Sequence, residues 1–222
     1  MDSVDNLEPE TLNGLNLYAY CGNNPVMRID PNGNLWFLIP IFIALAASTV
    51  VGGVVGGVTA SMNGGSFWEG FAYGALSGVL IAGGALLMPF MPHLGATMVG
   101  FGVGSLAGGA FNLANGGSYS AGWLGGGVNG GLNALGTSLG MPTLGGFLGG
   151  FFGSAITQRI DKGSVDLGVA LMNGIINAAL NKAARFPAMS AFANSLYFST
   201  VGSISSALNE LLWYLIQPFK FW

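Results

Sequence analysis

Charged residues are nearly absent from the centre of this chain, which limits the surroundings in which it can fold. Between Pro31 and Gln158, a run of 128 residues, Glu69 is the only Asp, Glu, Lys or Arg. These four residue types make up 7% of the 222-residue chain, whereas a soluble domain carries about 25%. A water-soluble fold of that size needs a charged outer face. We therefore expect the centre of the chain to lie in lipid or inside a larger shell.

The rest of the composition excludes several functional classes. No basic stripe is present, so nucleic acid is not an expected partner. Cys21 and His93 are each the only residue of their type, which excludes a disulfide framework and a zinc cluster built within the chain. After Gly33 there is no Ser/His/Asp set and no phosphate-binding loop. The sequence therefore predicts a protein that is not an enzyme and binds no metal or cofactor.

A sharp change of composition at Gly33–Asn34 divides the chain into two predicted domains, 1–33 and 34–222. The first is polar, acidic and rich in turns, with a possible short strand at 17–20, and it contains no cleavable signal peptide. Export would then use a specialised secretion system or a larger parent protein. The second is apolar, and its first 26 residues from Leu35 exceed the roughly 20 that span hydrocarbon.

An internal repeat predicts the helices of the second domain. The sequence Asn-Gly-Gly-Ser at 63–66 recurs at 115–118, 52 positions later, and a third copy reads Asp-Lys-Gly-Ser at 161–164. Each copy has the pattern of an apolar helix, a tight turn and a second apolar helix whose N-cap is the turn serine. The sequence thus predicts an all-α fold of about seven helices: three hairpins, 35–62 with 66–88, 94–114 with 118–139 and 142–160 with 164–185, and a last helix at 187–216.

Glycine spacing indicates how these helices would pack. Among the 39 glycines are four triples at i, i+4 and i+8, a spacing that makes one flat helix face along which a second helix approaches backbone to backbone in lipid. In water each interior glycine costs about 1 kcal/mol relative to alanine, so the pattern favours a bilayer over a buried scaffold or a glycine-rich linker. The triples are Gly70, Gly74, Gly78; Gly100, Gly104, Gly108; Gly122, Gly126, Gly130; and Gly145, Gly149, Gly153.

The first 33 residues resemble the C-terminal end of the Rhs/YD-repeat-associated core domain. The similarity runs through residues 2–27 and ends in Pro25-x-x-x-x-Asp30-Pro31-x-Gly33, the boundary motif of that family. In the family the repeats build a hollow β-shell, and the variable sequence after the motif is a toxin carried inside. The resemblance implies that residues 34–222 are such a toxin tip, belonging to the polymorphic toxins.

Many members of that family cut themselves just after the motif with a pair of aspartates. Asp30 matches the motif aspartate, and Asp2, 28 positions upstream, resembles its partner. A close aspartate pair can share one proton, so that one acts as base and the other as acid. Here Asn34 separates Gly33 from the leucine that usually follows it directly, and the shell is missing. Autoproteolysis is therefore expected in the parent protein only.

Glu69 and His93 each allow two interpretations. Glu69 follows Ser66 by three positions, as in a capping box at a helix N-terminus, although an isolated acid in an apolar region also suits a cation-favouring pore. His93 lies in a proline-containing loop between hairpins, where it is either a solvated polar group or a pH sensor for insertion.

Asparagines form stripes on the later predicted helices. Asn173, Asn177 and Asn181 share one helix face, and Asn129 and Asn133 lie beside a glycine face. Such amide stripes either line a water-filled channel or join helices through hydrogen bonds. The sequence leaves both roles open, with pore lining slightly favoured.

Together these features predict the C-terminal toxin of an Rhs polymorphic toxin that inserts into a target membrane and forms a pore or depolarises it. It would be delivered by a specialised secretion system. Its expected partners are the lipid bilayer, the Rhs core shell of the parent, a cognate membrane immunity protein and further copies of itself. The alternatives are a non-toxic transmembrane translocation or scaffold module of an Rhs protein, and an enzymatic effector with an unrecognised site.

Overall fold

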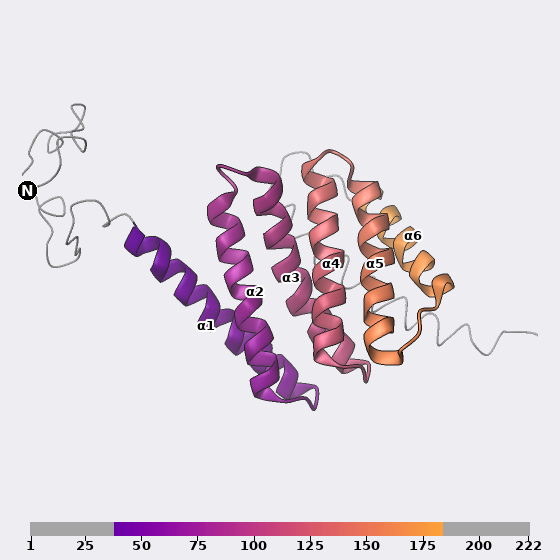
Figure 1. Ribbon diagram of the computed structural model, residues 1–222, viewed down its shortest axis with the longest axis horizontal. Coiled ribbons are helices and arrows are strands. Elements are labelled where there is room, and N and C mark those ends of the chain that lie inside the picture. The colour runs from indigo at the N-terminus through magenta and orange to yellow at the C-terminus, as the bar shows by residue number, and fades with distance from the viewer. Residues whose placement is uncertain (1–37, 184–222) are drawn as a thin grey trace, which may run out of the picture. The chain divides into compact units, whose positions relative to one another are not determined.

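All regular structure in the described part of the chain is helical, which confirms the predicted all-α class. The computed structural model describes residues 38–183, so the predicted strand at 17–20 and the predicted last helix at 187–216 lie outside the described residues. Six α-helices follow one another (Figure 1): α1 (Leu38–Met62), α2 (Phe67–Leu87), α3 (Pro92–Ala114), α4 (Tyr119–Ser138), α5 (Pro142–Lys162) and α6 (Leu167–Ala183).

The chain divides into two compact units between Ala46 and Ala47. The described part of the first unit is the beginning of α1. In the second unit each helix packs on the next one in sequence, α2 on α3, α3 on α4, α4 on α5 and α5 on α6, with a smaller contact between α2 and α4. The hairpin turns at 63–66, 115–118 and 163–166 lie at one end of these helices, here called the turn end, and the connections at 88–91 and 139–141 lie at the other, the loop end (Figure 1).

The first two turns form as the repeat predicts. Ser66 Oγ accepts a hydrogen bond from the backbone N–H of Glu69 at 3.5 Å, and Ser118 Oγ accepts one from Ala121 at 3.2 Å. Gly64 and Gly116 have φ of 80° and 83°, a left-handed conformation that residues with a Cβ seldom adopt. Each hairpin therefore reverses direction within one short turn and begins its second helix on a serine cap.

The third turn differs, and the prediction that Ser164 caps the following helix is wrong. The capping acceptor is Asp166 Oδ1, which receives hydrogen bonds from the N–H groups of Gly168 at 2.9 Å and Val169 at 3.2 Å. Helix α6 consequently begins at Leu167. A carboxylate is favoured there over a hydroxyl because its charge also interacts with the positive end of the helix dipole.

Glycines bring the helices of the first two hairpins into backbone contact. A Cβ built on Gly74 would collide with the carbonyl oxygen of Gly52, and one built on Gly126 would collide with that of Gly104. The two pairs are 52 positions apart, so the sequence repeat is also a repeat of contacts. The same correspondence relates the pairs Gly56–Gly70 and Gly108–Gly122, and the pairs Ser48–Gly78 and Gly100–Gly130.

Candidate membrane-inserting surface and buried asparagine seam

Three of the described helices are long and apolar enough to cross a membrane. These are Ile39–Met62, Phe67–Leu87 and Pro92–Ala114, in α1, α2 and α3. Their mean hydropathy falls in that order, whereas the buried share of the most apolar stretch rises from 22% in α1 to 44% in α3. The most apolar helix is thus the most exposed one, opposite to what water would favour.

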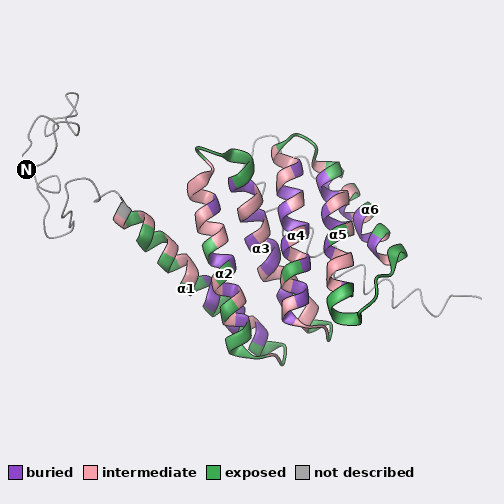
Figure 2. Cartoon of the chain, viewed as in Figure 1, coloured by how far each residue is buried: buried purple, intermediate pink, exposed green. Residues whose placement is uncertain are grey.

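Side-chain size is also distributed in the reverse of a soluble protein, with small residues buried and large apolar residues exposed. Figure 2 shows exposed residues along α1 and more buried residues toward α3, α4 and α5. Within the helices that the structure describes, Val99 is the largest apolar side chain that is fully buried, and most of the buried apolar residues are alanines. Large apolar residues lie outside: Trp68 is 74% exposed and Met62 80%. Small residues between helices and large apolar ones on the surface are the arrangement found in lipid, where close packing rather than the hydrophobic effect joins helices.

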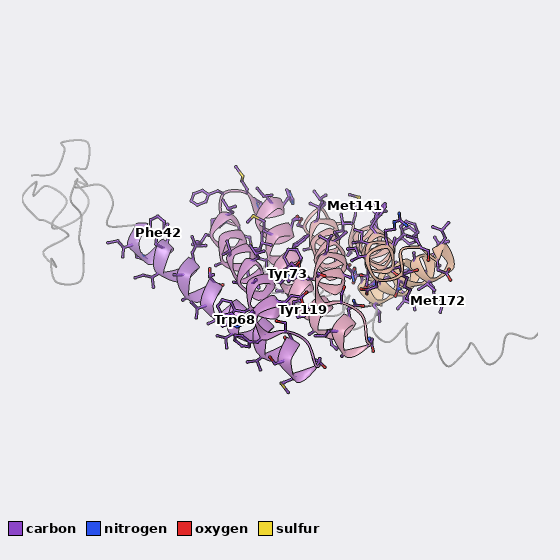
Figure 3. The ribbon with its side chains drawn as sticks, turned by 60° about the horizontal axis from the view of Figure 1, so that its bottom comes forward. Phe42, Trp68, Tyr73, Tyr119, Met141 and Met172 are labelled. Atoms are coloured by element: carbon purple, nitrogen blue, oxygen red, sulfur yellow. The ribbon has the colours of Figure 1, made fainter. Side chains whose placement is uncertain are left out.

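An aromatic cluster joins α2 to α4, two helices that are not consecutive in the sequence. The ring centroids of Tyr73 and Tyr119 are 6.1 Å apart, and those of Tyr73 and Trp123 are 5.2 Å apart; Figure 3 labels both tyrosines. Trp123 Nε1 donates to the carbonyl oxygen of Tyr73 at 3.0 Å and to Ser77 Oγ at 2.9 Å. Ring contacts and side-chain hydrogen bonds therefore join the first hairpin to the second.

The predicted third hairpin suggests that the fourth glycine triple faces α6, but in the structure it faces α4. Gly149 and Gly153 of α5 face the preceding helix, α4: a Cβ on Gly149 would lie 2.6 Å from the carbonyl oxygen of Asn129. The adjacent face of α5 receives α6, because a Cβ on Gly150 would lie 2.5 Å from the carbonyl oxygen of Asn173. Helix α5 is therefore a thin element with small residues on two sides.

Five asparagines of α4 and α6 lie on either side of this thin helix and form what we call the asparagine seam: Asn129, Asn133, Asn173, Asn177 and Asn181. All five are at most 3% exposed. Asn133 Nδ2 donates to Asn129 Oδ1 at 2.7 Å, and Asn181 Nδ2 donates to Asn133 Oδ1, which joins α6 to α4 directly. Asn181 Nδ2 also donates to the carbonyl oxygen of Pro142 at 3.0 Å. Asn181 thus joins α6 to both α4 and α5, whereas Asn133 and Asn177 donate to asparagines of their own helices.

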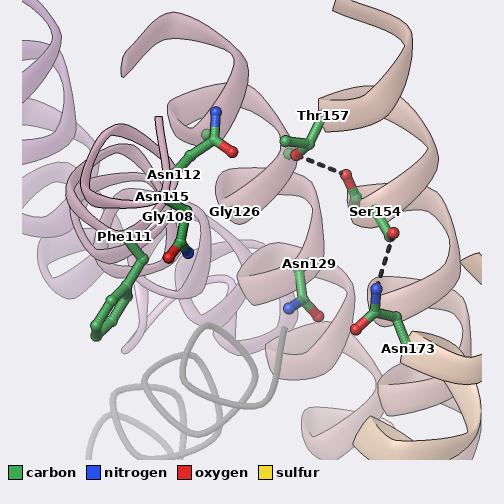
Figure 4. Close-up of a pocket in the computed structure, with 12 residues that line it drawn as sticks. Gly108, Phe111, Asn112, Asn115, Gly126, Asn129, Ser154, Thr157 and Asn173 are labelled. Carbon is green, nitrogen blue, oxygen red and sulfur yellow. Dashed lines mark hydrogen bonds between the residues drawn. The ribbon is translucent and has the colours of Figure 1, made fainter. Parts of the chain in front are cut away.

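A small cavity lined by both polar and apolar residues lies next to the seam, between α3, α4, α5 and α6 (Figure 4). Asn173 Nδ2 donates to Ser154 Oγ at 2.9 Å at its edge. Its volume of about 50 Å³ suits a few water molecules. The cavity is lined by Gly108, Phe111, Asn112, Asn115, Gly122, Gly125, Gly126, Asn129, Gly153, Ser154, Thr157 and Asn173.

Glu69 and His93 lie at opposite ends of the helices. Glu69 is exposed in the first turn of α2, where its backbone N–H, and not its carboxylate, forms the hydrogen bond with the cap Ser66. His93 is exposed in the first turn of α3, and its Nδ1 is 3.1 Å from Ser138 Oγ at the end of α4. Neither side chain lies in the asparagine seam. The predicted pair Asp2 and Asp30 lies outside the described residues.

Asp161 connects the third hairpin to the second turn, a contact that the sequence pattern does not predict. Its Oδ1 accepts hydrogen bonds from Ser118 N at 3.0 Å and Ser118 Oγ at 2.6 Å, while its Oδ2 accepts one from Asn112 Nδ2 at 2.6 Å. The only signal in the sequence is the change from asparagine to aspartate at this position of the repeat. The carboxylate also lies at the N-terminus of α4, where the helix dipole favours an anion.

Removal of this carboxylate is expected to loosen the turn end. Asp161→Ala loses three hydrogen bonds to a charged acceptor, but the site is exposed, so we expect the free energy of unfolding to fall by about 1 kcal/mol. Amide hydrogen exchange of Ser118 should accelerate. The matched control is Lys162→Ala at the neighbouring exposed position, expected to change stability by less than about 0.5 kcal/mol. Equal effects of the two substitutions would show that the Asp161 contacts contribute nothing.

Within residues 38–183 no three His, Cys, Asp or Glu side chains gather as a potential metal site. Comparison with protein-family models, with curated proteins and with solved structures gave no match to this chain.

Proposed function

We propose that this chain is a membrane-inserting toxin tip of the Rhs polymorphic type, which makes a target membrane leak. The observation that carries the proposal is the inverted distribution of residues: three long apolar helices expose their large side chains, and glycine, alanine, serine and asparagine fill the contacts between helices. In water this surface would aggregate, whereas in hydrocarbon it needs no partner.

The resemblance of residues 1–33 to the end of an Rhs core supports the toxin part of the proposal. A hollow shell would hide the apolar surface of α1 and α2 until release. A protein that acts by insertion needs no catalytic group, consistent with the few titratable side chains of the described helices. Its immunity protein would then be a membrane protein that blocks insertion or assembly in the producing cell.

The closed asparagine seam bears on how a leak would form. Because the five amides are buried against α5, a polar path along them requires that the seam opens. We favour a leak between several assembled copies, because it leaves the buried hydrogen bonds of the seam intact. The closed seam also gives support to the second candidate, a translocation or scaffold module that enters the membrane without making it leak.

Dye release from liposomes, with membrane current recorded in parallel, tests the proposal on the full 222-residue chain. We expect release and discrete conductance steps. Membrane association without leakage would contradict the toxin activity and leave the translocation or scaffold role. A chain that stays in solution beside the liposomes would contradict insertion itself.

A matched pair of lysine substitutions sharpens this test. Val51 is 62% exposed near the middle of α1, so Val51→Lys would place a charge within the hydrocarbon. A charge there costs about 2.5–3.5 kcal/mol on insertion scales, so about 100-fold more protein should be needed for the same leakage. Asn63→Lys adds the same charge to the exposed first turn and should leave leakage unchanged. Equal leakage from both variants would show that this face of α1 does not meet lipid.

A further inference from the structure

The helices α2 and α3, with the connection at 88–91 between them, are here called the α2–α3 hairpin. We infer that this hairpin enters the bilayer with its loop end first, and that the turn end stays at the surface from which the protein arrives. The inference rests on the proposed membrane insertion and adds its direction. It concerns residues 67–114, which contain two of the three candidate spans and the connection at 88–91.

The loop end exposes large apolar side chains, which a contact with lipid would explain. Phe90 is 82% exposed and Met91 55%, in a connection bounded by Pro89 and Pro92. The other connection at this end, between α4 and α5, exposes Leu139 and Met141, each 48% (Figure 3 labels Met141). The His93–Ser138 contact brings the two connections together. Large apolar residues at a loop tip are costly in water and favourable at the surface of a bilayer.

Among residues 38–183 charge is distributed in the opposite way, with five of the six charged side chains at the turn end. Within residues 67–114 the only formal charge is Glu69, in the first turn of α2. Further charges at that end belong to α5 and its turn, and the Asp161–Ser118 contact holds them beside the turn that follows α3. At the loop end the described residues carry one formal charge, Lys182 on α6, which is not a candidate span. The charges of the α5 turn are Arg159, Asp161, Lys162 and Asp166.

The direction follows from what each end would carry across the hydrocarbon. Considered for residues 67–114 alone, the loop-first direction takes Phe90 and Met91 across without a formal charge. A turn-first hairpin takes Glu69 across, at about 2.5–3.5 kcal/mol for one charge at the bilayer centre, and the contact with Asp161 adds more charges to the cost. That difference favours the loop-first direction by more than about tenfold.

The turn end also has an interfacial anchor. Trp68 is 74% exposed next to Glu69, and its ring centroid lies 5.4 Å from that of Phe67 and 6.0 Å from that of Phe71. Tryptophan is enriched where hydrocarbon meets the headgroups. Helices of 21 and 23 residues, at a rise of 1.5 Å per residue, are about 30–35 Å long and match the hydrocarbon thickness. With Trp68 at one interface, Phe90 then reaches the other.

The accessibility of a biotin label to streptavidin, compared at two matched positions, tests the direction of insertion. In the 222-residue chain carrying Cys21→Ser, a single cysteine replaces either Phe90 or Met62, which are similarly exposed apolar residues, 82% and 80%, at opposite ends. Each cysteine is biotinylated, the protein is added to vesicles of phosphatidylcholine and phosphatidylglycerol, and streptavidin, too large for a small pore, is added outside. We expect capture at position 90 to be about tenfold lower than at position 62, and equal capture in detergent.

The outcomes separate the direction from insertion itself. Protection at position 62 with capture at position 90 would establish the turn-first direction and overturn the inference. Capture at both positions from protein that floats with the vesicles would also overturn it, because the hairpin would then lie on the surface. Protein that does not float with the vesicles would overturn the membrane function on which the inference rests.

Discussion

Gly126→Ala is expected to lower the free energy of unfolding by about 2–3 kcal/mol, although alanine is the better helix former by about 1 kcal/mol. The new methyl group would collide with the carbonyl oxygen of Gly104 and lie 2.7 Å from Cα of Gly108. Both atoms belong to the backbone of α3, so no side chain can rotate away, and the two helices must separate along their length. Unfolding in detergent micelles, followed by far-ultraviolet circular dichroism, measures the effect.

Gly131→Ala is the matched control on the same helix. A Cβ at Gly131 would meet its nearest neighbours, two atoms of the Phe101 side chain, at 3.5 Å, which is ordinary van der Waals contact. We therefore expect this variant to gain about 0.5–1 kcal/mol from reduced conformational freedom of the unfolded chain. If Gly126→Ala stabilised the protein as Gly131→Ala does, the close approach of α3 and α4 would be refuted.

Asn133→Ala is the substitution with the second large expected effect. Asn133 is fully buried, donates to the carbonyl oxygen of Asn129 at 2.9 Å and to Asn129 Oδ1 at 2.7 Å, and accepts from Asn181. Its truncation removes these bonds and leaves buried amide groups unpaired, at about 1–3 kcal/mol each. We expect a loss of about 3 kcal/mol in the free energy of unfolding, whereas Asn63→Ala, in an exposed turn, should change it by less than about 0.5 kcal/mol.

A double-mutant cycle separates the bond across the seam from the general cost of a cavity. If Asn133 and Asn181 act through each other, the double alanine variant should cost less than the sum of the single variants, by about 0.5–2 kcal/mol. Additive losses would mean that α4 and α6 are not joined through these amides and that the seam is two separate stripes.

The helices and the packing of the first two hairpins could be predicted because both signals are local. A glycine face is visible as a spacing of four, and the turn at 115–118 repeats the one at 63–66 residue for residue. Periodicity also placed the five seam asparagines on shared helix faces. Periodicity could not assign the partner of each face. The contacts of α5, with Gly149 against α4 and Gly150 against α6, were therefore not predicted.

The tertiary contacts between hairpins were beyond prediction for a related reason. The contact of Asp161 with Ser118 and the aromatic cluster at Trp123 join residues 43 to 50 positions apart, and no local pattern records how one hairpin is placed against the next. The cap at Asp166 was missed because the third copy of the turn extends by two residues, and repeat matching favoured the serine that occupies the equivalent position.

The row of helices has a consequence for how this chain can unfold from one end. Since each described helix packs mainly on its neighbours in sequence, the stability of the row is close to a sum of neighbouring interfaces. The contacts of Trp123, Asp161 and Asn181 reach beyond the neighbouring helix and add to that sum. Such a chain can be pulled through a narrow conduit from one end, losing one hairpin at a time. Each hairpin can then form again as it emerges, within the microseconds to milliseconds typical of helical proteins with local contacts.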